Sequence, residues 1–209
     1  HGIRATLSVN AAVCHHYPQV ISETLASGWE MLGHGYIQRV MNLEEDERNV
    51  IRRSMDTIKE ATGTAPRGWM GPGLGETFET PDLLAEEGIE YVCDWCNDDQ
   101  PYPMKVKSGS LTSIPYTVEL NDIPIYLVQH HRAPEIFERA KDQFDTLYAE
   151  GAESARVMAV STHPYITGVP YRIKYYNQIW EYIRQFDDVI FMTGSEILDW
   201  YKSATKGAT

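Results

Sequence analysis

The stretch Arg156-Val-Met-Ala-Val-Ser-Thr-His163-Pro-Tyr-Ile-Thr-Gly168 decides how this chain is expected to fold. Its apolar-leaning run from Val157 to Val160 predicts a buried strand, and Pro164 ends that strand because proline has no N–H to donate to a sheet. α/β enzymes place their chemistry at the carboxyl ends of buried parallel strands, and imidazole moves protons near neutral pH. His163 is therefore our first candidate for a catalytic residue, with a hydrogen-bonded structural histidine as the alternative.

Strand and helix signals alternate along the rest of the chain. Apolar runs predict strands at residues 3–9, 29–32, 68–70, 89–92, 157–162 and 189–192. Periodicity and capping residues predict helices at residues 11–27, 44–62, 80–88, 134–149, 171–185 and 195–201, with Asn42 as the N-cap of the second. Such alternation is typical of a parallel sheet or barrel with right-handed crossovers. Because no linker or repeat interrupts it, we expect a single domain over residues 1–209, with residues 101–124 as an elaborated loop.

Composition sets limits on the class of protein. The 209 residues are 43% hydrophobic and 23% charged, which suits one globular domain with a sizeable core. The net charge of −12 offers no basic face to nucleic acid or to an anionic membrane, so we expect neither as a partner. No apolar stretch reaches the roughly 20 residues of a membrane-spanning helix and no signal peptide is visible, which favours a cytoplasmic protein. Segments rich in Tyr and Trp favour a homo-oligomer.

The three cysteines, Cys14, Cys93 and Cys96, argue against a disulfide framework because their number is odd and their spacing is irregular. Cys93 and Cys96 have the C-x-x-C spacing of redox motifs, but residues 97–101, which follow, open a helix poorly. A zinc site of this type needs a second such pair, which the sequence lacks. We therefore expect neither redox chemistry nor zinc binding from these cysteines.

Polar and aromatic residues recur around the ends of the predicted strands. If the strands close into a barrel, their carboxyl ends all open on one face, which is where barrel enzymes bind substrate. No single residue of this group identifies a site, but their common register predicts one at this face. The group comprises His34, Arg67, Trp69, Asp94, Trp95, Asn97, His163, Thr193 and Glu196.

Three segments, in this order, resemble the polysaccharide deacetylase family: Gly33-His34-Gly-Tyr-Ile-Gln38, Arg67-Gly-Trp-Met-Gly-Pro-Gly73 and Ser161-Thr-His163-Pro164. Together with the loop Asn97-Asp98-Asp99-Gln-Pro101-Tyr102, they look most similar to the allantoinase and cyclic-imide-hydrolase branch of that family. The resemblance covers nearly the whole chain. It implies an α/β fold, a distorted (β/α)7 barrel of the polysaccharide deacetylase type, and hydrolysis of carbon–nitrogen bonds other than peptide bonds.

Two departures from the family pattern bear on metal binding. The family's first strand carries an Asp or an Asp pair that serves as base and metal ligand, and such a strand would precede His1, so we expect an N-terminally incomplete domain that lacks its first strand. Gln38 stands where the family has its second His ligand, and a neutral amide is a poor ligand for zinc. His34 is left as the candidate metal ligand. We therefore expect no resident cofactor, with zinc or another divalent metal as the alternative.

The reaction that the resemblance implies is attack of water on an amide or imide carbonyl. Such a reaction needs a base, stabilisation of the oxyanion and a proton donor for the leaving nitrogen. We assign the role of proton donor to His163. His34 would position the water or polarise the carbonyl, unless it is a structural histidine. The base is expected upstream of His1, with Asp94 or Glu76 as substitutes.

The remaining candidates would bind substrate, and each has a structural alternative. Arg67 would orient a carboxylate or ureido group with its planar fork of donors, or else form an ion pair. Trp69 and Trp95 would wall a flat ring, or else belong to the core. Gly73 would let a ligand approach the backbone closely. Further polar candidates are Glu76, Asn97, Glu119, Asn121 and Asp122, of which the last three would close over the substrate unless they form a solvated hairpin.

Three functions stay open on the sequence alone. The leading one is a hydrolase of the allantoinase or cyclic-imide type, metal-independent or weakly metal-binding, that acts on a small-molecule amide, ureide or imide. The second is a metal-dependent carbohydrate N-deacetylase that acts on an N-acetyl sugar of a polysaccharide or chitooligosaccharide and uses His34 as a ligand. The third is a non-catalytic binding domain.

Overall fold

The computed structural model describes residues 1–206, which divide into two compact units. The sheet unit consists of Gly2–Trp95, Pro101–Ile114 and the described residues from Phe191 onward. The helical unit consists of His1, Cys96–Gln100 and Pro115–Ile190. Each unit has its own packing and its own candidate residues.

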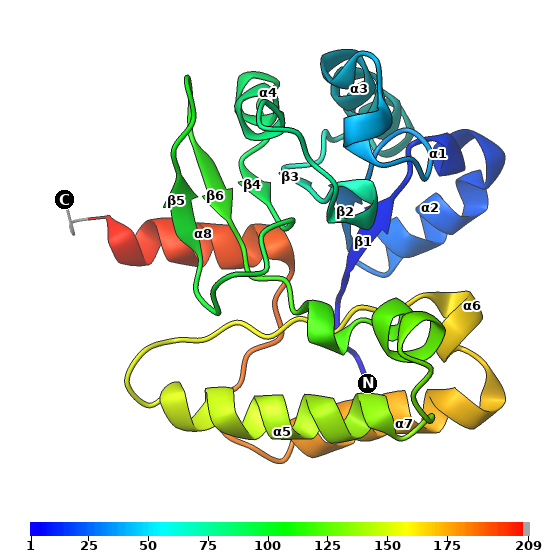
Figure 1. The fold of residues 1–209 in the computed structure, drawn as a ribbon, viewed down its shortest axis with the longest axis vertical. Coiled ribbons are helices and arrows are strands. Elements are labelled where there is room, and N and C mark those ends of the chain that lie inside the picture. The colour runs from blue at the N-terminus through cyan, green and yellow to red at the C-terminus, as the bar shows by residue number, and fades with distance from the viewer. Residues whose placement is uncertain (207–209) are drawn as a thin grey trace. The chain divides into compact units, whose positions relative to one another are not determined.

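A six-stranded sheet forms the framework of the sheet unit (Figure 1). Its spatial order is β1-β2-β3-β4-β6-β5, and neighbouring strands run parallel except that β5 pairs antiparallel with β6. The first four strands confirm four of the predicted ones, whereas the β5–β6 hairpin falls in the region expected to be a loop. The strands are β1 (Thr6–Val9), β2 (Glu30–Gly33), β3 (Gly68–Trp69), β4 (Tyr91–Val92), β5 (Tyr102–Met104) and β6 (Leu111–Ser113).

Helices cover both faces of this sheet, because successive strand residues point to opposite faces. Val92 belongs to a core cluster with residues of α3 and α4, whereas Tyr91 packs with Leu198 of α8. The helices of this unit are α1 (Ala12–His16), α2 (Pro18–Ala26), α3 (Glu47–Thr62), α4 (Thr80–Glu86) and α8 (Gly194–Thr205), with 3-10 turns η1 (Met41–Leu43) and η2 (Pro72–Leu74).

Local chemistry explains why two predicted helix boundaries are wrong. Pro18 divides the predicted helix at residues 11–27 into α1 and α2, since proline lacks an N–H and suits the first position of a new helix. α3 begins at Glu47 because Asp46 caps it: its carboxylate accepts a backbone N–H of the first turn at 3.0 Å. Asn42, the predicted cap, lies in η1 instead.

The ring of Tyr91 fills a slot that only glycine leaves open. A Cβ atom on Gly68 or on Gly194 would overlap the Tyr91 side chain. Tyr91 is fully buried, and its hydroxyl donates a hydrogen bond to Glu30 at 2.8 Å. Glu30 also accepts the Ser195 N–H at 3.0 Å, in the first turn of α8. One tyrosine thus fastens β4 to β3, β2 and α8.

β5 is the outer strand of the sheet on the β6 side, and Pro103 lies at its middle. Proline cannot donate a backbone hydrogen bond, so it is found on outer strands and interrupts the row of donors that such a strand presents. Pro103 is exposed and pairs with Thr112 of β6. The outer strand is therefore both short and unable to offer a continuous ladder.

The helical unit is built on two long helices, α5 and α7, that lie side by side (Figure 1). An aromatic cluster joins them: the ring centroid of Phe144 lies 6.0 Å from that of Tyr182 and 4.9 Å from that of Phe186, both in edge-to-face geometry. The elements are η3 (Val118–Leu120), the π-helical turn η4 (Ile123–Val128), α5 (Glu135–Glu150), α6 (Pro164–Thr167) and α7 (Pro170–Ile183).

Two predicted strands are wrong. Residues 157–162 and 189–192 carry no strand in the described structure, apart from one isolated bridge at Ser161. The backbone of the first segment bonds to loop groups instead: the N–H of Val157 donates to a loop carbonyl at 2.8 Å, and that of Ala159 to a loop hydroxyl at 3.1 Å. The apolar run correctly indicated a half-buried segment, but it did not indicate which groups accept the hydrogen bonds of its backbone.

The longest helices are amphipathic. α3 and α5 have 16 residues each, and both combine buried apolar positions with charged ones. Within residues 1–206, no helix has the length and apolarity needed to cross a bilayer.

Candidate active site

His163 lies at the N-terminus of α6, in the helical unit, next to a buried carboxylate. Its ring Nδ1 donates a hydrogen bond to Asp122 Oδ1 at 2.7 Å, and its backbone N–H donates to Asp122 Oδ2 at 2.8 Å. The Thr167 hydroxyl donates to the same Oδ2 at 2.7 Å. Asp122 is completely buried, while 36% of the His163 side chain is exposed. The His163 imidazole is thus accessible to solvent while the buried Asp122 carboxylate holds it in place.

This geometry fixes the protonation pattern of the His163 ring. A carboxylate has acceptors only, so Nδ1 carries a proton and Nε2 is the nitrogen that exchanges one. The Asp122 carboxylate oxygen lies 2.7 Å from Nδ1 and holds the ring in this orientation. An imidazole held in this way gives or takes a proton through Nε2.

Asp122 lies next to His163 because residues 121 and 122 run beside Ser161 outside any regular strand. Asn121 forms a parallel bridge with Ser161, and the Asp122 N–H donates to the Ser161 carbonyl at 3.2 Å. We predicted that Asp122 would close over the substrate together with Asn121 and Glu119. That prediction is wrong for Asp122, which is buried beneath the imidazole, whereas Glu119 is exposed in η3.

His34 follows β2 in the sheet unit and is half-buried. Its ring Nδ1 donates to the Met70 carbonyl at 2.5 Å, and its backbone N–H donates to the Val9 carbonyl at 3.2 Å. Since a carbonyl only accepts, Nδ1 carries the proton and the lone pair of the neutral ring is on Nε2. The orientation of this ring is therefore set by the residue that follows β3.

The described residues do not fit the divalent metal that the family resemblance implies. Within residues 1–206, no three His, Cys, Asp or Glu side chains gather as a metal-binding group. Gln38, which replaces the second His of the family motif, is exposed and offers a neutral amide. This donor set would give zinc one imidazole, from His34, and we assign no chemical step to a metal.

Glu76 and Asp94 are two neighbouring, interacting carboxyl groups beside the glycine-rich turn of the sheet unit. The Gly71 N–H donates to both Asp94 oxygens, at 2.8 and 3.0 Å, and Trp95 Nε1 donates to Glu76 Oε2 at 3.0 Å. Burial raises the pKa of Glu76, and burial together with the neighbouring Glu76 charge raises the pKa of Asp94 well above its usual value. The two substitute bases predicted from sequence therefore meet each other.

Arg67 and Trp69 have the contacts of the structural alternatives that we named for them. Arg67 precedes β3 and so lies at the amino end of that strand, where Asp199 at 2.7 Å and Glu90 at 2.6 Å bind its guanidinium and raise its pKa. Trp69 is completely buried in the core of the sheet unit. The structure thus favours an ion pair for Arg67 and a core role for Trp69, and substrate binding by Arg67 stays a prediction.

The other substrate-binding candidates are accessible. Trp95 is 43% exposed, and Gly73 is exposed with a left-handed φ of 66°. Asn97 and Glu119 are exposed in the helical unit. Their contact with a substrate stays a prediction. Each unit thus contains one pair of interacting candidate residues, and neither pair was predicted as such.

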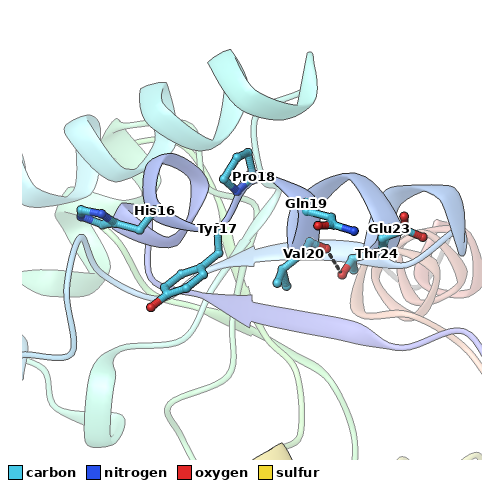
Figure 2. Close-up of a pocket in the computed structure, with 7 residues that line it drawn as sticks. All are labelled: His16, Tyr17, Pro18, Gln19, Val20, Glu23 and Thr24. Carbon is cyan, nitrogen blue, oxygen red and sulfur yellow. Dashed lines mark hydrogen bonds between the residues drawn. The ribbon is translucent and has the colours of Figure 1, made fainter.

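A hollow of about 640 Å³ on the surface of α1 and α2 contains none of the candidate residues (Figure 2). The hydrogen bond drawn there, from the Thr24 hydroxyl to the Val20 carbonyl at 2.7 Å, is internal to α2. Nothing in this lining resembles the hydrogen-bonded pairs described above, so we do not place the chemistry there. The lining residues are His16, Tyr17, Pro18, Gln19, Val20, Glu23 and Thr24.

No family model matches the chain. Its relatives and similar solved structures include proteins named as polysaccharide deacetylases and a protein named as an allantoinase. The chain is 28% identical over 201 residues to a Schizosaccharomyces pombe protein named as a polysaccharide deacetylase, which covers 86% of this chain and 62% of that one. A solved structure from Pseudomonas aeruginosa PAO1, described as a probable polysaccharide deacetylase, is 30% identical with a TM-score of 0.84 over 94% of this chain and 68% of that one. The PuuE allantoinase structure is 29% identical with a TM-score of 0.86 over 96% and 68%.

Parallel strands with helices on both faces, together with these TM-scores, define an α/β fold of the polysaccharide deacetylase type, which confirms the predicted fold class. The chain belongs to the polysaccharide deacetylase family. It spans 62% of the length of the Schizosaccharomyces pombe relative.

Proposed function

We propose that this protein hydrolyses carbon–nitrogen bonds other than peptide bonds, by attack of water on the carbonyl of a small amide, ureide or imide. The observation that carries the proposal is the hydrogen-bonded pair of His163 and Asp122, because a half-exposed imidazole on a buried carboxylate is suited to proton transfer. Membership of the polysaccharide deacetylase family supports the same reaction class.

His163 acts as the proton donor in this proposal. Water adds to the carbonyl carbon and loses a proton to a base, and the carbon–nitrogen bond then breaks as the leaving nitrogen takes a proton from Nε2. Nδ1 keeps its proton and its 2.7 Å hydrogen bond to Asp122 throughout. Asp122 therefore holds the ring in the required tautomer and stabilises its protonated form before the transfer.

We infer a ureide or cyclic imide as the substrate class. Two observations support this choice: the 29% identity to PuuE allantoinase, and the donor set around His34, which suits zinc poorly. A carbohydrate N-deacetylase is the second candidate, and the names of the Schizosaccharomyces pombe relative and the Pseudomonas aeruginosa structure favour it.

A panel of three substrates tests the proposal: allantoin, a cyclic imide and an N-acetylated chitooligosaccharide, each assayed for the acid or acetate released. We expect hydrolysis of the ureide or imide, unchanged after chelation, and a loss of about 10²-fold or more in His163→Ala. His15→Ala, which changes an exposed histidine of α1, is the matched control. Release of acetate alone, dependent on one bound divalent metal per chain, would establish the second candidate instead.

The same panel decides whether the protein is a binding domain. Absence of turnover on all three substrates, combined with ligand binding that survives His163→Ala, would refute the proposed reaction. Calorimetric titration of wild type and His163→Ala with the same three compounds supplies this measurement.

A further inference from the structure

The carboxyl pair of the sheet unit cannot satisfy its hydrogen bonds if both groups are ionised. Asp94 accepts the Gly71 N–H with both oxygens, and Glu76 Oε2 accepts the indole N–H of Trp95. Glu76 Oε1 is buried and has no hydrogen-bond partner among the described residues. The Asp94 carboxyl is the neighbouring acidic group that interacts with Glu76. Carboxylates only accept, so a proton on one of the two groups is needed for them to form a hydrogen bond with each other.

We propose that Glu76 and Asp94 share one proton at neutral pH, and that this proton makes them a positioning pair for His34. The shared proton is inferred only from contacts within the sheet unit. Its effect on catalysis rests on the hydrolysis proposed above.

Charges around the pair favour retention of the proton. Glu47 of α3 raises the pKa of Glu76 further, and its own carboxylate accepts the Thr80 hydroxyl of α4 at 2.6 Å. The interaction with Asp94 and, after it, the Trp95 indole lower the pKa of Glu76, and the Gly71 N–H lowers that of Asp94. Burial is the largest cause for both carboxyls, and it disfavours two adjacent negative charges.

A chain of hydrogen bonds leads from the pair to the imidazole. Asp94 holds the Gly71 N–H, and the Met70 carbonyl on the other side of the same peptide bond accepts His34 Nδ1 at 2.5 Å. The turn is closed tightly here, since a Cβ on Gly71 would lie 2.8 Å from the Gly75 carbonyl and 3.0 Å from Asp94 Oδ2. Movement of Asp94 would therefore rotate the peptide that orients His34.

This arrangement changes the role of Asp94. Both of its oxygens are engaged by Gly71, and the shared proton occupies its remaining capacity on the Glu76 side. Asp94 is therefore a positioning residue and not the base that we predicted as a substitute. Glu76, predicted to bind substrate, instead supplies the second half of the proton site and anchors the Trp95 ring.

The first test replaces one carboxyl group of the pair with an amide, whose N–H protons do not titrate. In Glu76→Gln the amide N–H₂ donates to Asp94 permanently, and in Asp94→Asn the amide donates to Glu76 while its oxygen accepts from Gly71. The wild-type pair has raised pKa values, so its stabilisation is complete below the unfolded values of 4.5 and 3.8 and is lost as pH rises through the folded ones. We expect either variant to lose less stability than wild type between pH 5 and pH 9, measured by urea unfolding.

Carbon-13 NMR titration of the carboxyl carbons reports the proton directly. We expect one protonated carboxyl at pH 7 in wild type and none in Glu76→Gln. Glu60→Gln, an exposed change on α3, is the control and should leave the titration unaltered. Two ionised carboxyls at pH 7, or pH–stability curves of both variants parallel to that of wild type, would overturn the inference.

The catalytic consequence has a separate readout. If the pair positions His34, the alkaline limb of the kcat profile moves by about one pH unit or more in Glu76→Gln, with KM nearly unchanged. An unmoved profile would overturn the positioning role. Failure of hydrolysis in wild type would refute the proposed function while leaving the NMR result intact, so the two failures are distinguishable.

Discussion

Asp122 determines what His163 can do at the scale of single residues. We expect Asp122→Asn to lower kcat by about 10²- to 10⁴-fold with a smaller effect on KM, because a neutral amide does not stabilise the protonated ring. Steady-state kinetics on the substrate found by the hydrolysis panel measures this effect. Asp142→Asn, an exposed change on α5, is the control. A wild-type kcat in Asp122→Asn would contradict the role given to the buried carboxylate.

The candidate residues could be predicted only where chemistry follows a local pattern. His163 was identified because a polar imidazole ends an apolar run before proline. The pairing of Asp122 with His163 was missed because 41 positions separate the two residues and the loop of Asp122 looked solvated. Arg67 was misplaced because sequence does not show that its guanidinium meets Asp199, 132 positions away. Pairs formed across such separations depend on tertiary packing.

The slot around Tyr91 makes a prediction about packing. We expect Gly68→Ala to lower the free energy of unfolding by about 1–3 kcal/mol, because the new methyl group overlaps a ring that is fully buried. Urea unfolding measures the loss. Adding Tyr91→Leu removes the overlapping atoms, so the double variant should lose less than the sum of the single losses. Additive losses would show that the methyl group and the ring do not compete for space.

At the scale of secondary-structure elements, α8 depends on its first turn. The Thr193 hydroxyl accepts the Glu196 N–H, and Glu196 Oε2 accepts the Thr193 N–H at 2.8 Å, which forms a capping box. We expect Thr193→Ala to lower the free energy of unfolding by about 1 kcal/mol, while Thr193→Ser keeps most of the stability. Thermal unfolding of the three proteins tests this expectation. Equal losses in both variants would assign the effect to the Thr193 methyl group.

Helices were more predictable than strands in this chain. The proline that opens α4 acts within one turn, so it is visible in the sequence, whereas the cap of α3 was assigned to Asn42 instead of Asp46. A strand exists only if another strand pairs with it. Residues 157–162 have the apolar character of a strand, yet their N–H groups bond to loop atoms and only Ser161 forms a bridge. The composition of the segment does not show whether its backbone pairs with a strand or bonds to loop atoms.

At the scale of the whole molecule, acid stability should depend on Glu90. Hydrogen bonds from Arg67, followed by Lys202, lower the pKa of Glu90 to about 2. Because the folded value lies below the unfolded value of 4.5, this contribution to stability is present above pH 4.5 and is lost as pH falls through about 2. We expect Glu90→Gln to be less stable than wild type at pH 7 but to lose less stability toward pH 2.

Urea unfolding of wild type and Glu90→Gln at a series of pH values checks this expectation. Glu60→Gln removes an exposed carboxylate of α3 and should follow the wild-type curve. If Glu90→Gln also follows that curve in the acid range, the ion pair does not govern acid stability.

The α/β class could be predicted because strand and helix signals alternate, but the arrangement within it could not. The β5–β6 hairpin escaped notice because Pro103 and the polar residues of β6 weaken the strand pattern. The division into two units was also invisible. One boundary falls between Trp95 and Cys96, inside the C-x-x-C motif, where no linker composition marks it.

Pro103 has a further consequence for the behaviour of this protein among copies of itself. An outer strand with a complete row of donors is a template for strand addition from another chain, and a proline at its middle removes one donor. We expect Pro103→Thr to restore the row and to increase light scattering in concentrated solutions held at 37 °C, with Pro81→Ala, at the start of α4, as the control. An unchanged scattering signal would show that this edge does not seed assembly. Pro103 would thus limit fibrillar growth at a position that no catalytic requirement explains.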